Sequence, residues 1–413
     1  MNVNPKAVLF ASTIAAFALG GGVATAGEIL WWTPNWGEAR AKELADKFMA
    51  ANPGITVKME VTVSDGLPTR IQTALRSGSP PDLIEAQHGW VVPYAQAGLL
   101  APLDDVLAAL GADDFVPASL KYDTWDGHVW GIPYRIETHG VLYNKGAFKA
   151  AGLDPEKPPE TWSELIEVAT KLTGKGANGQ DQYGFAITGG GEFGNTVFRS
   201  LPFIWMNGGS IISDDMTKAT VNEPAAVEAV TFYTDFLKKG LSPPSTLQND
   251  GTANRRLFIA ETVAMYQSGQ FDVGSIRKEN PNIDIGVMMI PHPEGKETAA
   301  ILGGWSFIVP KDAPNPDETK KFIEFLAQSE NMGFFTDTFP ARVSAMEMER
   351  FKDPILTVFK AMLPHGRTLP PHKNWIPITQ AYFDGVQSIL LGDAEPQEAM
   401  DIAAEEIQAL LDQ

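Results

Sequence analysis

The sequence predicts an α/β protein made of two units of similar size. Strand and helix patterns alternate along the chain, which is typical of α/β layers, and the alternation starts again near residue 160. The length of 413 residues suits two or three domains. No internal repeat or low-complexity tract is visible, so two α/β units fit better than one large sheet.

The first unit shows the order β-α-β-α-β. A short apolar run at 29–32 predicts a buried strand. Residues 38–51 predict a helix, because their apolar side chains recur on one 3.6-residue face. Residues 55–63 alternate apolar and polar without a fault, as a half-buried strand does. Pro68 can open the next helix, and Leu83 starts a third strand.

The second unit begins with a helix marked by Thr161 and Glu164, which form the T-x-x-E pattern of a capping box. Strands expected at 129–134 and 140–143 belong to the end of the first unit, and beyond the capping box further strands are expected at 183–188, 283–290 and 305–310. Further helices are expected at 222–239, 317–328 and 396–411.

Composition and charge exclude several classes of function. There are 32 basic and 51 acidic residues, and the net charge is −19. Phosphate backbones and anionic membrane faces repel such a surface, so neither nucleic acid nor a membrane is an expected partner. The chain has no cysteine, which excludes disulfides, thiolate zinc sites, cysteine nucleophiles and a cysteine-linked lipid anchor.

Residues 1–26 have the form of a secretory signal peptide. Lys6 precedes an apolar run at 7–19, and Ala24-Thr25-Ala26 matches the A-x-A cleavage pattern. We therefore expect the mature chain to begin at Gly27. No later stretch has the apolar length of a transmembrane helix, and an exported protein without an anchor suits the periplasm best.

Two familiar motifs carry little weight. Residues 189–194 match GxGxxG after an expected strand, but a nucleotide loop needs a helix directly behind it, and Pro202 is expected to interrupt one. None of the six histidines form a ligand pair at metal-binding spacing. We therefore expect no metal, no cofactor and no catalytic residue.

The tryptophans are more informative. Trp36, Trp90, Trp305 and Trp375 lie beside glycine or asparagine at the ends of expected elements. A pyranose has an apolar face that lies on an aromatic ring, and its hydroxyls need planar polar partners. Aromatic side chains with polar neighbours therefore indicate a sugar pocket, although most single tryptophans belong to cores.

At this point the chain resembles the sugar-binding class of periplasmic solute-binding proteins of ABC transporters, the maltose-binding-like group known as extracellular solute-binding protein family 1. The most specific stretch is WDGHVWGIPY at 125–134, followed by VLYNK at 141–145. The other stretches are PETWSEL at 159–165, LGGWSF at 302–307 and PQEAM at 396–400. Their order and spacing carry the resemblance from Ile29 to the C-terminus.

The resemblance implies the type II fold of these periplasmic binding proteins, in which two α/β lobes are joined by hinge segments and hold the ligand in the cleft between them. Crossings are expected near 137–140, 301–306 and 339–343. One lobe would comprise 27–137 and about 305–339. The other would comprise about 141–301 and 343–413.

The resemblance also implies a set of ligand-binding residues, mostly at strand ends. They are Asn35, Trp36, Gln87, His88, Glu137, Phe271, Gly303, Gly304, Trp305 and Arg342. Asp65, Asn195 and Trp375 complete the expected set. Two departures from the family pattern leave the sugar unspecified: Gln87-His88 replaces a common acidic residue, and the segment 372–375 matches no shared motif.

The resulting hypothesis is a non-enzymatic carbohydrate receptor that acts as a monomer and delivers its ligand to the permease subunits of an ABC transporter. One alternative is a binding protein of the same fold for a charged ligand, either a polyamine or an anionic sugar derivative. The residues that could bind an anion are Arg342, Arg367, His88 and His372. A further alternative is an exported glycosidase, which would need positioned acids that no motif marks.

Overall fold

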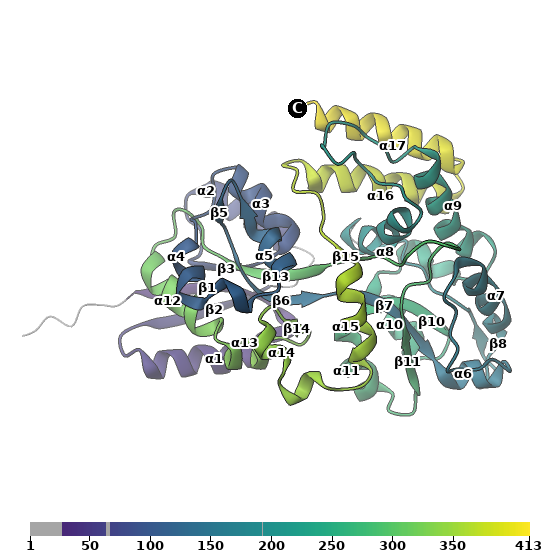
Figure 1. Cartoon of the computed structure of the whole chain (residues 1–413), viewed down its shortest axis with the longest axis horizontal. Helices are drawn as coiled ribbons and strands as arrows, with labels where there is room; N and C mark the ends of the chain where they lie inside the picture. The colour runs from purple at the N-terminus through teal and green to yellow at the C-terminus, as the bar shows by residue number, and fades with distance from the viewer. Residues whose placement is uncertain (1–26, 63–66, 192) are drawn as a thin grey trace, which may run out of the picture.

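The computed structural model describes residues 27–62, 67–191 and 193–413, and it consists of two lobes side by side (Figure 1). The expected signal peptide, at 1–26, and Asp65 lie outside the described residues. Among the residues described, no helix is long and apolar enough to cross a membrane.

The first lobe surrounds a six-stranded sheet with the order β14-β6-β13-β3-β1-β2. Its strands are β1 (Glu28–Pro34), β2 (Thr56–Thr62), β3 (Leu83–Gln87), β6 (Ile132–Glu137), β13 (Gly303–Ile308) and β14 (Phe339–Pro340). Its helices are α1 (Glu38–Ala51), α2 (Leu67–Ser77), α3 (His88–Gln96), α4 (Asp104–Leu110), α5 (Pro117–Asp123), α12 (Pro316–Leu326), α13 (Ser329–Phe335) and α14 (Val343–Met346).

The second lobe surrounds a three-stranded antiparallel sheet with the order β10-β7-β11. These strands are β7 (His139–Asn144), β10 (Met265–Gly269) and β11 (Ile285–Met288), and a short pair is formed by β12 (Ala300–Ile301) and β15 (Gly366–Arg367). Its helices are α6 (Lys145–Ala150), α7 (Trp162–Leu172), α8 (Phe193–Met206), α9 (Pro224–Lys238), α10 (Gly251–Ile259), α11 (Phe271–Glu279), α15 (Leu356–Met362), α16 (Trp375–Leu391) and α17 (Pro396–Leu411).

The chain passes between the lobes at β6–β7 and again at β12–β13, with only Thr138 and Leu302 between the paired strands. The third passage differs from the expected one at 339–343. Beyond β14, α14 packs on α13, the Phe351 ring lies 6.5 Å from that of Phe339, and Arg350 donates to the Gly333 carbonyl oxygen (2.9 Å), so this segment is still packed on the first lobe. The chain reaches the second lobe at α15, where the carbonyl of Phe359 accepts a hydrogen bond from Thr138 Oγ1 (3.0 Å).

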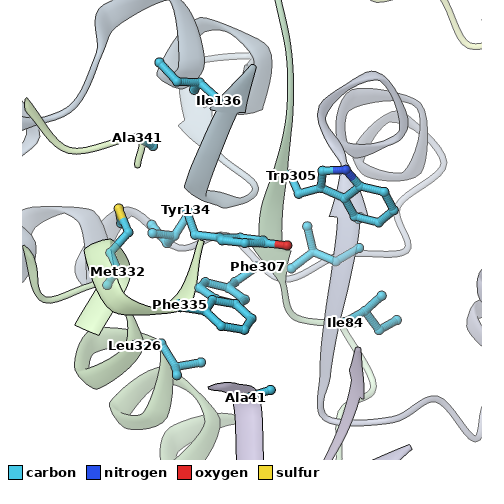
Figure 2. Close-up of a cluster of buried hydrophobic side chains, with 14 of the residues drawn as sticks. Ala41, Ile84, Tyr134, Ile136, Trp305, Phe307, Leu326, Met332, Phe335 and Ala341 are labelled. Atoms are coloured by element: carbon cyan, nitrogen blue, oxygen red, sulfur yellow. The ribbon is translucent and has the colours of Figure 1, made fainter. Parts of the chain in front are cut away.

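Aromatic packing dominates the core of the first lobe (Figure 2). Tyr134 of β6 stacks on Phe307 of β13 with ring centroids 4.5 Å apart, and Phe335 of α13 packs under both. The Tyr134 hydroxyl donates to the buried Glu85 carboxyl (2.6 Å). These contacts fix β13 beside β3 and β6, and so fix the edge of the sheet at which the second lobe begins.

Most local predictions are confirmed. Helices α1 and α17 have the predicted bounds, and Thr161 and Glu164 form both bonds of a capping box at α7. The strand expected at 183–188 is wrong: this segment has only isolated bridges to Val263 and Tyr266. Several of its backbone donors are bonded elsewhere, for instance Thr188 N–H to the Tyr233 hydroxyl (2.9 Å).

The expectation that no helix follows the GxGxxG motif is also wrong. Helix α8 begins at Phe193 and contains Pro202. Proline removes one backbone donor and crowds the preceding turn, which disfavours a helix interior. Packing against α9 and α16 buries most of α8 and outweighs that cost.

Candidate functional site

The candidate site lies where the first-lobe sheet meets the crossing strands. Strands β1, β3 and β6 run in the same direction and β13 runs against β3 and β6, so three strand ends and the start of β13 share one edge. In the register of the sheet, Trp305 lies opposite Gln87 on one side and Arg135 on the other, and Gly303 lies opposite Glu137. This edge collects residues that are far apart in sequence.

Three tryptophans pack together at this edge. The Trp305 ring meets the Trp36 ring edge-on at 4.7 Å and the Trp90 ring edge-on at 5.5 Å. Trp305 is only 4% exposed, whereas Trp36 and Trp90 are half-buried. Figure 2 shows the Trp305 indole to the side of the Tyr134–Phe335 stack. Trp305 is therefore the support of an aromatic surface whose accessible parts are Trp36 and Trp90.

A buried ion network adjoins the tryptophans. The Arg135 guanidinium pairs with Glu137 and with Asp337 (3.0 Å), and it lies 5.5 Å from the centroid of the Trp36 ring. Burial lowers the pKa of Arg135, but attraction to Glu137 and Asp337 outweighs burial and raises this pKa above its usual range. The Glu137 side chain is 12% exposed, so its carboxylate is fixed by Arg135 and still reaches the surface of the site.

His88 lies beneath the same edge as a neutral side chain. It is 2% exposed, its ring is 5.0 Å from that of Tyr122, and neither ring nitrogen has a hydrogen-bond partner among the described residues. Burial, and then the positive charge of Arg135, lower the pKa of His88 to about 3. A neutral imidazole has one donor and one acceptor nitrogen; both are buried here, and the Trp305 backbone lies close enough to act on one of them.

Gly303 and Gly304 keep the backbone close to these side chains. A Cβ added to Gly304 would lie 2.5 Å from His88 Cε1 and 2.3 Å from the Arg135 carbonyl oxygen. A Cβ on Gly303 would lie 3.0 Å from Glu137 Cγ and 3.1 Å from Phe198 Cε1 of the second lobe. Gly304 is therefore required by space, whereas a side chain at position 303 would need Glu137 and Phe198 to shift by a few tenths of an ångström.

The second lobe brings its own residues to the crossing. Phe271 is half-buried at the start of α11, with its ring 6.0 Å from that of His139. Asn195, on the first turn of α8, accepts hydrogen bonds from Arg199 and from Gly251 N–H (3.4 Å). Gln270 Nε2 donates across the lobes to the carbonyl oxygen of Ile136 (3.4 Å).

The structure thus brings most of the expected residues to one junction, but not all. Asn35 is exposed on the single turn η1 (Asn35–Gly37), and Gln87 is half-buried at the end of β3. Trp375 is 4% exposed and packs in the core of the second lobe at the start of α16. Its neighbouring loop reaches the first lobe, where Gln96 donates to the Pro371 carbonyl (3.3 Å).

Arg342 is not brought to this junction, contrary to the expectation from the sequence. Its guanidinium pairs with Asp114 (2.7 Å) and donates to the carbonyl oxygens of Ala327 and Leu110 (both 3.1 Å). These partners engage all three nitrogen atoms of the Arg342 guanidinium within the first lobe, where Arg342 joins the ends of α4 and α12.

Sequence reasoning did not select Arg135, His139, Phe198 or Gln270. Arg135 and His139 each lie two residues from the selected Glu137. Because side chains two residues apart along a strand point to the same face, this spacing was a signal that could have found both. Phe198 and Gln270 carry no such signal, because only the packing of α8 and β10 against the crossing brings them there.

Comparisons with known proteins agree with this architecture. The profile of the bacterial extracellular solute-binding protein family matches residues 34–333. A protein of Brucella abortus (strain 2308), named as a binding protein, is 29% identical over 376 residues, which cover 90% of this chain and 89% of the relative. The sn-glycerol-3-phosphate-binding periplasmic protein UgpB of Escherichia coli K12 is 28% identical over 436 residues and covers 97% of each chain.

Solved structures show the same fold. An ABC transporter solute-binding protein from Thermotoga lettingae, bound with α-D-tagatose, has a TM-score of 0.85 at 28% identity and covers 93% of this chain and 99% of its own. The maltose/maltodextrin-binding domain MalE from Bdellovibrio bacteriovorus has a TM-score of 0.81 at 23% identity, covering 94% of this chain and all of its own. The predicted two-lobed fold is confirmed, and because the family profile spans most of the chain, the protein belongs to the bacterial extracellular solute-binding protein family.

Proposed function

We propose that this protein is the substrate-binding component of an ABC transporter and captures a carbohydrate between its lobes. The observation that carries the proposal is the surface formed by Trp36 and Trp90 on Trp305, next to the carboxylate of Glu137. An aromatic face takes the apolar side of a sugar ring, and the adjoining donors and acceptors take its hydroxyls.

A charged ligand is the second candidate, because one relative covering 97% of the chain is named for sn-glycerol-3-phosphate. Of the groups that could have served an anion, Arg342 is bonded to Asp114 and two carbonyls, and Arg135 is paired with two carboxylates. A phosphate at the tryptophan surface would have to compete with these pairs. Arg367 is exposed on β15, its carbonyl accepts from Leu302 N–H at the crossing, and it forms no ion pair among the described residues, so it stays available to an anion. The preference for a neutral sugar therefore rests on the tryptophan surface and on the pairing of Arg135.

A thermal-shift screen tests the proposal directly, since a ligand that binds only the folded state raises the melting temperature. The panel comprises D-tagatose, maltose, maltotriose, sn-glycerol-3-phosphate and spermidine. We expect a neutral sugar to raise the melting temperature and to be recovered unchanged. A shift with sn-glycerol-3-phosphate or spermidine alone would contradict the carbohydrate assignment, and hydrolysis of maltotriose by purified protein would contradict a purely binding role.

We also propose that the chain is exported to the periplasm, is cleaved after Ala26 and acts as a monomer. The A-x-A pattern at Ala24 and Ala26 supports the cleavage. Intact-mass analysis of a periplasmic extract should give a chain that starts at Gly27. A chain of full mass in that extract would contradict the proposed cleavage.

A further inference from the structure

Two buried polar side chains of the second lobe lie on one sheet face beside the crossing. Strands β7 and β10 pair so that Gln267 is opposite Val141 and Gly269 is opposite His139. Side chains alternate between faces along a strand, so His139, Val141 and Gln267 share a face. Gly269, opposite His139, has no side chain, and the Phe271 ring takes that place: a Cβ on Gly269 would lie 2.3 Å from Phe271 Cε1.

These side chains lack hydrogen-bond partners that buried polar groups normally have. His139 is 6% exposed and Gln267 is 3% exposed. Within residues 27–62, 67–191 and 193–413, no partner is present for His139 Nδ1 or for Gln267 Nε2 and Oε1. More than nine in ten buried polar groups are hydrogen-bonded in folded proteins. Other described side chains also carry an unpartnered buried atom, but only Gln267 and His88 lack a partner at both polar atoms. An unpartnered carboxamide beside an unpartnered imidazole nitrogen is therefore the best candidate for a ligand.

The surroundings connect this pair to the tryptophan site. The rings of Phe271 and Phe198 lie 6.0 and 6.2 Å from that of His139. Phe198 also borders Gly303, next to Glu137. Burial, and then the charge of Arg199, hold the pKa of His139 well below its usual value, so its ring is neutral. Arg199 itself donates to the Gln267 carbonyl oxygen (3.2 Å) and to Asn195.

We propose that His139 and Gln267 form the second-lobe half of the ligand site and bind two neighbouring hydroxyl groups of a neutral sugar. This inference rests on the proposed carbohydrate-binding function. A neutral imidazole and a carboxamide each offer a donor and an acceptor, as each hydroxyl does. A dianionic phosphate only accepts, so it would leave the acceptor atoms of the pair unsatisfied.

The test uses the substitutions Gln267→Met and His139→Phe, which keep volume and remove the polar atoms. An unpartnered buried polar group destabilises the fold, so its apolar replacement should leave the ligand-free melting temperature unchanged or higher. Affinity for the sugar identified in the screen should fall at least tenfold in each variant, as measured by calorimetry.

Gln182→Met is the matched control. Gln182 is also buried, at 8% exposed, but its Nε2 donates to the Leu172 carbonyl (2.7 Å) within the second lobe. This control should melt earlier and bind normally.

The two hypotheses fail in different ways. A wild-type protein that binds none of the neutral sugars contradicts the proposed function. Gln267→Met and His139→Phe variants that melt earlier than wild type without ligand, or that bind the sugar as wild type does, overturn the role of the pair. The melting measurement needs no ligand, so it tests the unpartnered state of these atoms even where the screen is negative.

Discussion

At the residue scale, Trp305 shows how one position serves both the fold and the site. A β-bulge between Trp305 and Ser306 interrupts the pairing with β6, and bulges re-aim the side chains that flank them. Trp305 consequently meets Trp36 and Trp90, while Ser306 bonds the buried Asp123. The sequence places Trp305 among the expected ligand-binding residues, but the aromatic rings that remain accessible at this edge are those of its half-buried neighbours Trp36 and Trp90.

The first prediction separates these roles. Trp36→Ala should weaken sugar binding by about 2 kcal/mol or more, the scale of an aromatic anchor, and should leave the fold largely intact because Trp36 is half-buried. Trp305→Ala should lower the free energy of unfolding by about 3–5 kcal/mol, as for a buried tryptophan. Calorimetry and urea denaturation measure the two effects. Trp125→Ala, at a half-buried tryptophan packed on Trp130, is the control and should bind normally.

The second prediction concerns Glu137. Glu137→Ala should lower the free energy of unfolding by about 3–5 kcal/mol, because it leaves the buried Arg135 with Asp337 alone, and it should also weaken binding. Glu137→Gln keeps one acceptor and should cost less. Glu60→Ala breaks a more exposed pair with Arg70 and should cost only about 0–1 kcal/mol in the same denaturation assay. Equal effects of Glu137→Ala and Glu60→Ala would contradict this account.

At the element scale, the loop between β15 and α16 spans both lobes. The Leu369 N–H donates to the Tyr122 hydroxyl of α5 (2.7 Å), and a Cβ on Gly89 of α3 would approach Leu369 Cδ1 to 3.3 Å. The Tyr122 ring also lies 5.0 Å from that of His88. The loop is thus joined to the candidate site through one buried tyrosine.

The third prediction is that Tyr122→Phe speeds ligand release without removing a ligand contact. The change leaves the buried Leu369 N–H without its partner, at a cost of about 1–3 kcal/mol. Because this hydrogen bond joins the two lobes, its loss destabilises the conformation in which the lobes are in contact. Stopped-flow tryptophan fluorescence should show a larger dissociation rate constant and a nearly unchanged association rate constant. In the control Tyr94→Phe, the lost bond to the Pro68 carbonyl (3.5 Å) lies within the first lobe. An equal rate change in both variants would refute the role of the loop.

At the scale of the whole molecule, two sheets are joined by crossing strands with one residue between them. Independently packed lobes on short connections rotate as rigid bodies. Ligand contacts to both lobes favour the closed arrangement, since only that arrangement makes all of them.

The fourth prediction follows from this geometry. Small-angle X-ray scattering should show a smaller radius of gyration when the sugar identified in the screen is added to saturation. The Trp36→Ala variant at the same sugar concentration is the control and should change less. An unchanged profile for the wild-type protein at saturation would contradict lobe closure.

The fifth prediction concerns pH. Burial raises the pKa of Asp123 to about 8, and the hydrogen bond from Ser306 opposes this only in part. Above its ordinary pKa near 3.8, the unfolded state has released a proton that the folded state still holds, so stability falls as pH rises toward 8. Burial likewise raises the pKa of Glu85, to about 7.

Urea denaturation between pH 7.5 and 8.5 separates these carboxyls from His88. Folding lowers the pKa of His88 from its ordinary value of 6.5 to about 3, and above pH 7.5 the unfolded imidazole is largely neutral too. Wild-type stability should fall across this interval by at most about 1.4 kcal/mol per pH unit for each carboxyl. Asp123→Asn should flatten the fall, whereas Asp113→Asn, at an exposed position, should not. A wild-type profile without slope would contradict a protonated Asp123.

Features of the fold that have a local cause could be predicted from the sequence, and features that depend on distant residues could not. The bounds of α1 and α17 and the capping box of α7 follow from periodicity and capping, which act within a few residues. Helix α8 and the segment 183–188 depend on what packs against them. Pro202 therefore wrongly indicated that no helix follows the GxGxxG motif, and the apolar run at 183–188 wrongly indicated a strand. The third passage between lobes depends on the packing of Phe351 beside Phe339, which no local pattern encodes.

The candidate site divides in the same way. The sequence alone determined the α/β class, the family resemblance and the residues at strand ends, because parallel strands bring their carboxyl ends to one edge whatever the details of packing. Only the tertiary structure decided that Arg342 is bonded within the first lobe, that Trp305 supports Trp36 and Trp90, and that His139 and Gln267 lack partners. Hydrogen bonding and burial are properties of side chains brought together from distant parts of the chain, so they exist only once the lobes have packed.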